Sequence, residues 1–328
     1  MSQGIIDNFG RPITYLRMAV TDRCNLRCYY CMPAEGINYL PKKELLTYEE
    51  MLKLAQVFCE MGVNKIRITG GEPFVRRDLM SFLRQLSETA GLNELHITTN
   101  GVLTAQYIDE LKALGIASIN LSLDSLNPER FFKITRRDVF TQVEETLNKL
   151  LDSGIDTKIN MVVMDGQNED DIIPMADLTK DKPLSIRYIE EMPFNGNGHN
   201  SIKWNHREIL NTLNTHYGSL TKLQDPQFST SSNYQIPGYQ GNIGIIAAYT
   251  RTFCGSCNRI RLTSEGNIKT CLYDQTQLDL KAILRSGGSD LELKQAITHA
   301  LTHRHKDGHA AEAARSTNVE ESMSTIGG

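Results

Sequence analysis

Along residues 14–192, hydrophobic and polar positions follow two different patterns, which alternate from one segment to the next. In one, short runs rich in β-branched residues have the character of strands. In the other, apolar residues recur every three to four positions, as on the buried face of a helix. Helices are predicted directly after Thr47 and over 79–90, 104–114, 139–153 and 169–180. The predicted strands are YLRMAVT from Tyr15, KIRIT from Lys65, ELHITTN from Glu94, ASINLSL from Ala117, TKINMVV from Thr157 and LSIRYIE from Leu184.

The helix after Thr47 has the clearest start. Thr47 and Glu50 have the spacing of a capping box, in which each side chain accepts a hydrogen bond from the other residue's backbone. Gly115 and Gly154 stand where glycine commonly ends a helix. Pro174 weakens the prediction of the last helix, because proline lacks the backbone donor that a helix interior uses.

Six strand–helix units in succession predict a parallel sheet, either doubly wound or curled toward a (β/α) barrel. In both architectures ligands bind at the carboxyl ends of the strands. We therefore expect the loops that follow the strands to meet at one site. These loops begin at Asp22-Arg23-Cys24, Gly70-Gly71-Glu72-Pro73, Asn100-Gly101, Asp124-Ser125 and Glu190-Glu191-Met192.

The regular alternation ends after residue 192. Residues 193–242 are rich in Asn, Gly, Ser, Pro and Gln and are expected to form loops. Beyond them, GNIGIIAAY, NRIRLTSEGNIKTCLY and DLKAILR indicate a small β-rich unit with a hairpin turn at Glu265-Gly266. The chain from about Thr302 is polar, and a mobile tail is expected there. We predict two domains, 1–225 and 226–328.

Composition excludes several classes of protein. A net charge of −4 argues against general nucleic-acid binding. No apolar run approaches the roughly 18 residues of a membrane helix, and the first residues lack the pattern of a secretory signal. The seven cysteines are then expected to be reduced rather than paired in disulfides. A cytoplasmic protein that binds neither nucleic acid nor membrane is expected.

Six of the seven cysteines form two groups of three. The first group is Cys24, Cys28 and Cys31, and the second is Cys254, Cys257 and Cys271. A tetrahedral metal site needs four ligands, so each group lacks one. Zinc completed by a distant histidine is one alternative. Two 4Fe–4S clusters, each with one iron open to a small molecule, fit the count better.

The first group also carries a family resemblance. Its C-x3-C-x2-C spacing, followed after the second strand by Gly70-Gly71-Glu72-Pro73, resembles the signature of radical S-adenosylmethionine (SAM) enzymes. In that superfamily, the methionine part of SAM binds the open iron. Further motifs are Asp7-x-Phe9-Gly10-Arg11, Asn258-Arg259-x-Arg261 beside the second group, and the terminal Gly327-Gly328. With them, nearly the whole chain resembles the GTP 3′,8-cyclase family, which performs the first step of molybdenum cofactor biosynthesis.

This resemblance implies an incomplete (β/α)6 barrel of the radical SAM type with a C-terminal iron–sulfur domain. It implies two 4Fe–4S clusters, SAM, and a 5′-deoxyadenosyl radical that removes the C3′ hydrogen of GTP. The implied product is (8S)-3′,8-cyclo-7,8-dihydroguanosine 5′-triphosphate. An external electron donor and the next enzyme of the pathway, cyclic pyranopterin monophosphate synthase, are implied partners, and a homodimer is compatible with the family.

Family positions map onto this chain residue by residue. The six grouped cysteines would ligate the clusters, and no side chain would act as acid or base. The tail residues Gly327 and Gly328 would enter the active site and be needed for turnover. Contacts to SAM are implied for Tyr30, Gly71, Ser122 and Met192, and contacts to GTP for Arg17, Arg67, Thr98, Lys158, Arg187, Arg259 and Arg261.

Physical chemistry supports the arginine assignments. A triphosphate needs fixed cations, and the planar guanidinium binds phosphate oxygens in pairs. Arg259 and Arg261 alternate, so on a strand both side chains would point to one face, beside the second cysteine group. The resemblance has one departure, because Ser231-Ser232-Asn233-Tyr234 stands where many members carry Gly-Pro-Ala.

Two alternatives remain open. One is a radical SAM enzyme that modifies a peptide, since such enzymes also carry an auxiliary cluster. The other is a non-catalytic iron–sulfur or zinc module. Arg259 and Arg261 favour a phosphorylated substrate over a peptide. The Gly-Gly-Glu-Pro loop would have no role in a non-catalytic module.

Overall fold

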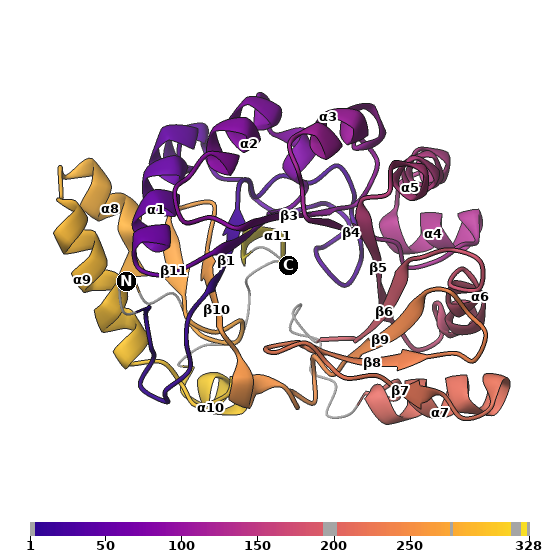
Figure 1. Ribbon diagram of the computed structural model, residues 1–328. Coiled ribbons are helices and arrows are strands. Elements are labelled where there is room, and N and C mark those ends of the chain that lie inside the picture. The colour runs from indigo at the N-terminus through magenta and orange to yellow at the C-terminus, as the bar shows by residue number, and fades with distance from the viewer. Residues whose placement is uncertain (1–3, 193–201, 276–277, 316–322, 327–328) are drawn as a thin grey trace.

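A single curved sheet organises the chain (Figure 1). A hollow lies on its concave side. The computed structural model describes residues 4–192, 202–275, 278–315 and 323–326. Within these residues twelve strands join in the order β12-β11-β10-β1-β2-β3-β4-β5-β6-β9-β8-β7. The central strands are all parallel: β1 (Tyr15–Ala19), β2 (Lys65–Thr69), β3 (Glu94–Thr99), β4 (Ser118–Ser122), β5 (Asp156–Val163) and β6 (Ser185–Glu190).

Strands from the C-terminal part of the chain extend both edges of this sheet. On one side β10 pairs in parallel with β1, and on the other β9 pairs in parallel with β6. The outermost strands are antiparallel, as hairpins require. These strands are β7 (Thr221–Lys222), β8 (Ser231–Gln235), β9 (Asn242–Ile246), β10 (Arg259–Leu262), β11 (Asn267–Lys269) and β12 (Leu278–Asp279).

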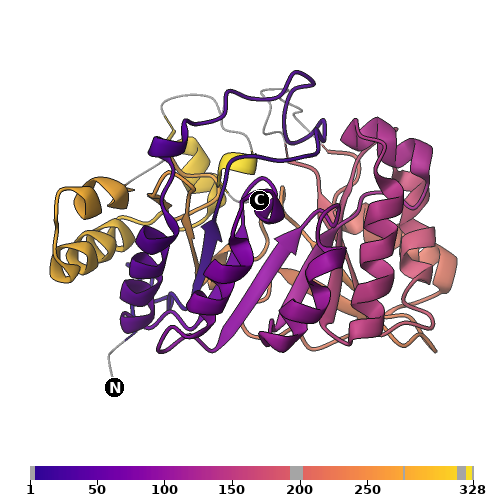
Figure 2. The same ribbon diagram turned by 90° about the horizontal axis from the view of Figure 1, so that it is seen from above.

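Helices cover the convex face of the sheet (Figures 1 and 2). Short α11 lies inside the arc, and α10 lies at the open end of the arc, where Gly308 lines the cavity. The helices are α1 (Tyr48–Glu60), α2 (Leu79–Ser87), α3 (Ile108–Ala113), α4 (Pro128–Thr135), α5 (Phe140–Ser153), α6 (Ile172–Asp177), α7 (His206–Tyr217), α8 (Leu280–Arg285), α9 (Asp290–Thr302), α10 (Gly308–Ala313) and α11 (Met323–Ile326). Single 3-10 turns are Lys42–Glu44, Pro73–Val75, Ala105–Tyr107, Glu169–Asp171 and Cys254–Ser256.

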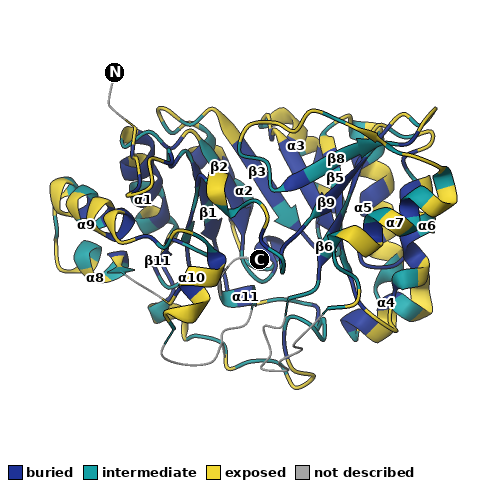
Figure 3. Ribbon diagram, turned by 90° about the horizontal axis from the view of Figure 1, so that it is seen from below, coloured by how far each residue is buried: buried dark blue, intermediate teal, exposed yellow. Residues whose placement is uncertain are grey.

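Each central strand has an apolar face and a polar face. Leu16 and Met18 of β1 are fully buried under the helices, whereas Tyr15 and Arg17 face the hollow. Because side chains alternate along a strand, every second residue of the parallel strands turns inward. The dark interior of the sheet and the exposed outer helix faces are visible in Figure 3. The fold therefore places polar side chains where a parallel barrel ordinarily packs apolar ones.

Two apolar cores lie between the sheet and its helices. One joins β1–β3 to α1–α3 and includes α9 through Leu293, Ile297 and Leu301. The other joins β5, β6 and β9 to the helices from α4 to α7. Because α9 shares its core with α1, the C-terminal segment is part of the same packing as the N-terminal strands.

The structure confirms the predicted incomplete barrel and all six predicted strands. The capping box at α1 is also confirmed, with Thr47 and Glu50 bonded reciprocally at 2.8 and 3.2 Å. The helix predicted over 169–180 is shorter, and Pro174 falls in the first turn of α6, where a backbone donor is not needed.

Two predictions were wrong. The expected loop over residues 193–242 contains the helix α7 and the strands β7 and β8. The side chain of Asn205 caps the start of α7. The chain after Thr302 is not a mobile tail throughout, because α10 packs in place and Arg304 is buried. The division after residue 225 stays a prediction. No helix among the described residues is long and apolar enough to cross a membrane.

Candidate active site

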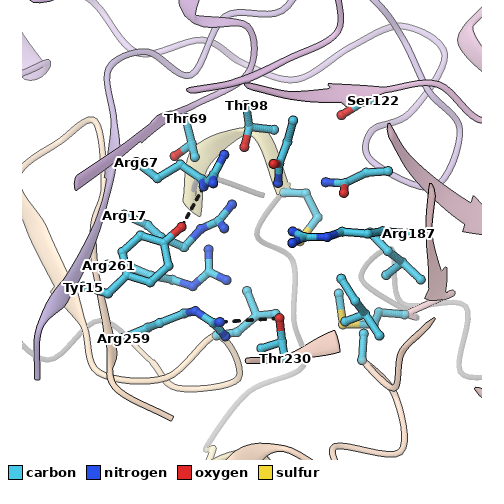
Figure 4. Close-up of a pocket in the computed structure, with 18 of the residues that line it drawn as sticks. Tyr15, Arg17, Arg67, Thr69, Thr98, Ser122, Arg187, Thr230, Arg259 and Arg261 are labelled. Carbon is cyan, nitrogen blue, oxygen red and sulfur yellow. Dashed lines mark hydrogen bonds between the residues drawn. The ribbon is translucent and has the colours of Figure 1, made fainter. Parts of the chain in front are cut away.

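The concave side of the sheet holds a cavity of about 920 Å³. Both cysteine groups line it, together with inward residues of β1 to β6 and of β10. The close-up in Figure 4 shows the side chains of several strands converging on this space. The expectation that the loops after the strands meet at one site is therefore confirmed, and the cavity is the candidate active site.

The first cysteine group lies in the loop after β1. The end of α4 holds this loop, because the backbone amides of Arg27 and Tyr29 donate to the carbonyls of Thr135 and Ile134 at 2.9 and 3.2 Å. The side-chain amide of Asn100 lies 3.7 Å from the sulfur of Cys24. Chain segments far apart in sequence thus fix the positions of the three thiols.

Burial favours the protonated form of the thiols of Cys24 and Cys28. It raises the pKa of Cys24 to about 12 and that of Cys28 above its usual range. Irons would reverse this preference, since a metal-bound thiol is deprotonated. In the described part of the chain, no three His, Cys, Asp or Glu side chains are placed to hold one metal ion. A four-iron cluster takes one thiolate per iron, so three cysteines would leave one iron open.

The glycine loop after β2 packs directly on the cysteine loop. The amide of Gly71 donates to the carbonyl of Thr21 at 2.9 Å, and that of Glu72 donates to Arg23 at 2.8 Å. Gly70 has φ +137°, and a Cβ there would collide with the carbonyl of Thr21. Glycine is therefore required so that the backbones of the two loops can touch.

Glu72 ties this loop to the next strand. Its buried carboxylate accepts hydrogen bonds from the Thr99 hydroxyl at 2.9 Å and from the amides of Phe74 and Asn100 at 3.1 and 2.7 Å. Burial raises the pKa of Glu72 to about 7. Sequence reasoning gave this residue no role of its own, although it stands inside the Gly-Gly-Glu-Pro motif.

The four residues predicted to contact SAM all line the cavity: Tyr30, Gly71, Ser122 and Met192. The Tyr30 hydroxyl donates to the buried carboxylate of Asp124 at 2.8 Å. Burial raises the pKa of Asp124 to about 6. The Tyr273 hydroxyl lies 2.9 Å from the sulfur of Met192, which connects this residue to the segment after the second cysteine group.

Five arginines form what we call the arginine belt: Arg17, Arg67, Arg187, Arg259 and Arg261. In the sheet register, Arg17 stands beside Arg67 on one side and beside Arg261 on the other. Figure 4 shows these three side chains and Arg259 stacked on one wall of the cavity, with Arg187 facing them. The register thus gathers cations from β1, β2 and β10, and Arg187 of β6 lies across the cavity from them.

The buried guanidinium groups of the belt repel one another. Burial and the neighbouring Arg261 lower the pKa of Arg17 to about 9. Burial and nearby arginines likewise lower the pKa values of Arg187 and Arg261 to about 10. The pKa of Lys158, on the same polar face, falls to about 7 because of burial and then Arg187. A multiply charged anion would relieve this repulsion.

Tyr15 lies at the centre of these cations. Arg67 Nε donates to its hydroxyl at 2.7 Å, and the Arg259 guanidinium lies 5.4 Å from its ring centre. Burial raises the pKa of Tyr15, but Arg67, Arg17 and Arg259 outweigh it and lower the pKa to about 7. Sequence reasoning missed this residue. The available signal was its position two residues before Arg17, on the same face of β1.

Several buried polar atoms of the cavity wall have no hydrogen-bond partner among the described residues. They are the Thr69 and Thr98 hydroxyls, the side-chain carbonyls of Asn120, Asn160 and Asn258, and Arg187 Nε. Buried polar groups are rarely left unpaired, so their concentration in one cavity indicates a polar ligand.

The second cysteine group lies on the opposite part of the cavity wall, next to β10 and β11. Arg304 Nη2 donates to the sulfur of Cys257 at 3.2 Å. Burial would raise the pKa of Cys257, but Arg304 and then Arg259 lower it below the usual value. By contrast, burial raises the pKa values of Cys254 and Cys271. Three thiols with adjacent guanidinium groups suit a cluster that lacks one protein ligand.

All predicted site residues that the structure describes are therefore brought around one cavity. Their individual ligands stay predictions. The tail residues Gly327 and Gly328 lie outside the described residues. Met323 and Ser324, just before them in α11, do line the cavity. The segment that departs from the family pattern adjoins Thr230, whose hydroxyl lies 3.4 Å from Arg259 Nη2 (Figure 4).

Comparison with known proteins gives two family matches. Residues 18–179 match the radical SAM superfamily, and residues 184–310 match the family described as Molybdenum Cofactor Synthesis C. The chain is 40% identical to GTP 3′,8-cyclase of Desulforamulus reducens, with 99% of this chain and 100% of that protein covered. It is 41% identical to the mitochondrial GTP 3′,8-cyclase of Arabidopsis thaliana, with 100% of this chain and 84% of that protein covered.

Other relatives are longer. Human molybdenum cofactor biosynthesis protein 1 is 43% identical over 93% of this chain, but the chain spans only 48% of that protein. Among solved structures, Streptococcus suis SuiB bound to S-adenosylmethionine matches with a TM-score of 0.58 at 17% identity. That match covers 83% of this chain and 65% of SuiB, and it shows the fold alone.

These matches agree with the arrangement of the cavity. The radical SAM match contains the first cysteine group and the glycine loop, and the second match contains the other three cysteines with Arg259 and Arg261. The relatives in Desulforamulus and Arabidopsis are covered over most or all of their length. The chain belongs to the radical SAM superfamily and, within it, to the GTP 3′,8-cyclase family.

Proposed function

We propose that this protein converts GTP to (8S)-3′,8-cyclo-7,8-dihydroguanosine 5′-triphosphate, the first step of molybdenum cofactor biosynthesis. The observation that carries the proposal is the arginine belt, which shares one cavity with both cysteine groups. A polyanion offsets the repulsion among the buried guanidinium groups. The same cavity then holds a phosphorylated substrate beside the source of its chemistry.

The first cysteine group would hold one 4Fe–4S cluster, and the loop after β2 would hold SAM beside it. When bound there, the cluster and SAM would supply the radical chemistry that removes the C3′ hydrogen of GTP. Tyr30 and Ser122 line the cavity where they can orient SAM, and Gly71 offers backbone there. No side chain needs to act as acid or base, so the role of the protein is to position SAM and GTP.

The second cysteine group would hold the second cluster, whose open iron would bind the guanine. The belt and Lys158 would bind the triphosphate, and Thr98 would donate or accept a hydrogen bond at the substrate. The tail residues Gly327 and Gly328 are proposed to enter the same cavity. Met323 and Ser324 at its wall support this, because only two residues separate Gly327 from Ser324.

Partners follow from the same chemistry. An external donor would supply the electron that starts each radical reaction, and cyclic pyranopterin monophosphate synthase would take up the product. The protein is proposed to work in the cytoplasm, where thiols stay reduced, and a homodimer is one assembly that the proposal accommodates. A peptide substrate would leave the belt without a counter-charge, which disfavours the peptide-modifying alternative.

Anaerobic turnover tests the proposal. Reconstituted and reduced protein is incubated with SAM, with and without GTP, and the products are identified by mass spectrometry. We expect about eight irons per chain, and 5′-deoxyadenosine together with a cyclised nucleotide only when GTP is present. Cleavage of SAM at the same rate without GTP would contradict GTP as the substrate.

A double variant tests the role of the belt in the same assay. Arg259→Ala with Arg261→Ala should leave the iron content unchanged, because neither residue is a ligand. GTP affinity, measured by calorimetry, should fall at least tenfold, since each charge-assisted hydrogen bond contributes roughly 1.5–3 kcal/mol. Unchanged affinity in the double variant would remove these two arginines from the nucleotide site.

A further inference from the structure

In the N-terminal motif Asp7-x-Phe9-Gly10-Arg11, the side chains of Asp7 and Arg11 are buried, and Arg11 reaches the cavity wall. One carboxylate oxygen of Asp7 accepts hydrogen bonds from the amides of Phe9 and Arg11, both at 2.9 Å. The other pairs with Arg11 Nε at 2.6 Å and with Arg304 Nη1 at 3.1 Å. Asp7 therefore fixes two guanidinium groups from opposite ends of the chain.

Both guanidinium groups bind the segment that carries the second cysteine group. Arg11 Nη1 donates to the carbonyl of Cys254 at 3.1 Å. Arg304 Nη1 donates to the carbonyl of Cys257 at 3.0 Å, and its Nη2 donates to the carbonyl of Arg259 at 3.0 Å. The same Nη2 lies 3.2 Å from the sulfur of Cys257. The side chain of Arg304 is only 3% exposed, so water cannot substitute for it.

We propose that Arg304 is a positioning residue for the second cluster. Arg304 holds the Cys257 thiolate in place and raises the reduction potential of that cluster. Hydrogen bonds to ligating sulfurs are among the features that set the potential of iron–sulfur clusters. A reduced cluster carries one more negative charge than an oxidised one, so a fixed buried cation stabilises the reduced form more. Removal of Arg304 then makes the cluster harder to reduce.

The contact also affects how firmly the cluster is held. Outer contacts that orient metal ligands typically change metal affinity 10- to 100-fold when they are removed. Arg304 bonds to the sulfur, to the carbonyl of the same cysteine and to the carbonyl of Arg259, so one side chain sets the position of the whole turn. This inference rests on the second cysteine group binding a cluster, but not on GTP being the substrate.

The test uses full-length protein in which Cys24, Cys28 and Cys31 are replaced by alanine, so that only the second cluster is present. In this parent, Arg304→Gln removes the positive charge. Arg304→Lys keeps the positive charge but removes the planar guanidinium group with its several donors. Asp7 still has Arg11 as its partner in both variants, so the fold should be retained. The matched control is Arg285→Gln, because Arg285 likewise bonds to a carboxylate and to backbone carbonyls, but at Glu50, Lys43 and Leu45.

Two readouts apply: iron loss to a chelator, and the midpoint potential from titration followed by electron paramagnetic resonance. We expect Arg304→Gln to lose iron about tenfold faster than the parent and to have a more negative midpoint potential. Arg304→Lys should restore most of the potential, and Arg285→Gln should match the parent. Parent-like potential and iron loss in Arg304→Gln would overturn the inference. A parent that binds no iron would overturn the assignment of the second cluster, and the inference with it.

Discussion

Tyr15 shows how one aromatic side chain can organise several cations. Its hydroxyl accepts a hydrogen bond from Arg67 Nε, and its ring lies near Arg259 on one side and Lys65 on the other. Its two neighbours in the register are Arg259 and Lys65. The ring separates the charges, and the hydroxyl fixes the direction in which Arg67 presents its remaining donors.

We predict that Tyr15→Phe weakens GTP binding about tenfold, because a hydrogen bond to a charged group contributes roughly 1.5–3 kcal/mol. The ring, and with it the contact to Arg259, is kept. The maximal rate should change little, since the hydroxyl does not touch the C3′ or C8 atoms in this proposal. Steady-state kinetics separates the two effects as a raised KM with an unchanged kcat.

Tyr217→Phe is the control for this change. The hydroxyl of Tyr217 donates to Asp177 at 2.8 Å, away from the cavity, so its loss should leave the KM for GTP unaltered. If Tyr15→Phe instead lowers kcat and leaves KM unchanged, then Tyr15 acts in the chemical step and not in binding.

The lowered pKa of Lys158 predicts that nucleotide binding depends on pH. Burial and the nearby Arg187 and Arg67 lower its pKa to about 7 in the free protein. A bound triphosphate favours the charged form and raises this pKa. Lys158 therefore contributes fully to affinity below pH 7, and its contribution declines as the pH rises above 7, because binding must then take up a proton.

Calorimetry of nucleotide binding at pH 8, in two buffers with different ionisation enthalpies, measures this uptake. The wild-type protein should take up more protons than Lys158→Arg, since arginine stays charged at all accessible pH values. The nucleotide's own titration is the same for both proteins and cancels in the comparison. Equal proton uptake in the two proteins would show that Lys158 is already charged before binding.

At the scale of elements, loops that follow different strands are joined through single buried groups. Glu72 is the clearest case, because it accepts hydrogen bonds from both its own loop and the end of β3. Gln can reproduce only part of this pattern, since one of its two terminal atoms is a donor. A donor would then face the backbone amide of Asn100.

We therefore predict that Glu72→Gln lowers the free energy of unfolding by about 1–3 kcal/mol. Denaturant unfolding of the metal-free protein measures this loss without interference from the clusters. Glu88→Gln, at the exposed end of α2, is the matched control and should change stability by less than about 0.5 kcal/mol. Equal stability of Glu72→Gln and wild type would mean that the carboxyl is protonated and already donates a hydrogen bond.

The strands of the barrel could be predicted from sequence because alternation is a local property. In β2, for example, Ile66 and Ile68 alternate with Lys65 and Arg67, and this pattern needs no knowledge of the partner strands. The helix α7 could not be predicted with the same ease. Its apolar residues Ile209 and Leu213 are few, and the Asn- and Gly-rich residues before it indicated a loop.

Only those residues of the candidate site that belong to a recognisable motif could be predicted from the sequence. The cysteines and the arginines of the belt are recognised through spacing and resemblance. The adjacency of Arg17 and Arg261 depends on the pairing of β1 with β10, which joins residues 244 positions apart and leaves no local signal. The contact of Arg304 with Cys257 joins residues 47 positions apart, and the polar sequence around Arg304 favoured a mobile tail.

At the scale of the whole molecule, the C-terminal strands complete the sheet on both sides. Without β10 and β9, the parallel strands β1 and β6 would become edges with unpaired backbone groups. The core around α1 would also lose Leu293, Ile297 and Leu301 of α9. These contacts suggest that residues 1–225 do not form an independent folding unit, whatever the boundaries of the two family matches.

We predict that a fragment of residues 1–225 is much less stable than the full chain and that the full, metal-free chain unfolds in one transition. Far-ultraviolet circular dichroism and tryptophan fluorescence report on different parts of the chain, since Trp204 packs against the core around β5 and β6. Coincident curves from the two probes support a single cooperative unit. Two separate transitions, together with a fragment that unfolds cooperatively at the same denaturant concentration as one of them, would establish two independent domains. In that case the belt would be assembled by docking of one domain on the other, and GTP affinity should fall when the two halves are supplied as separate chains.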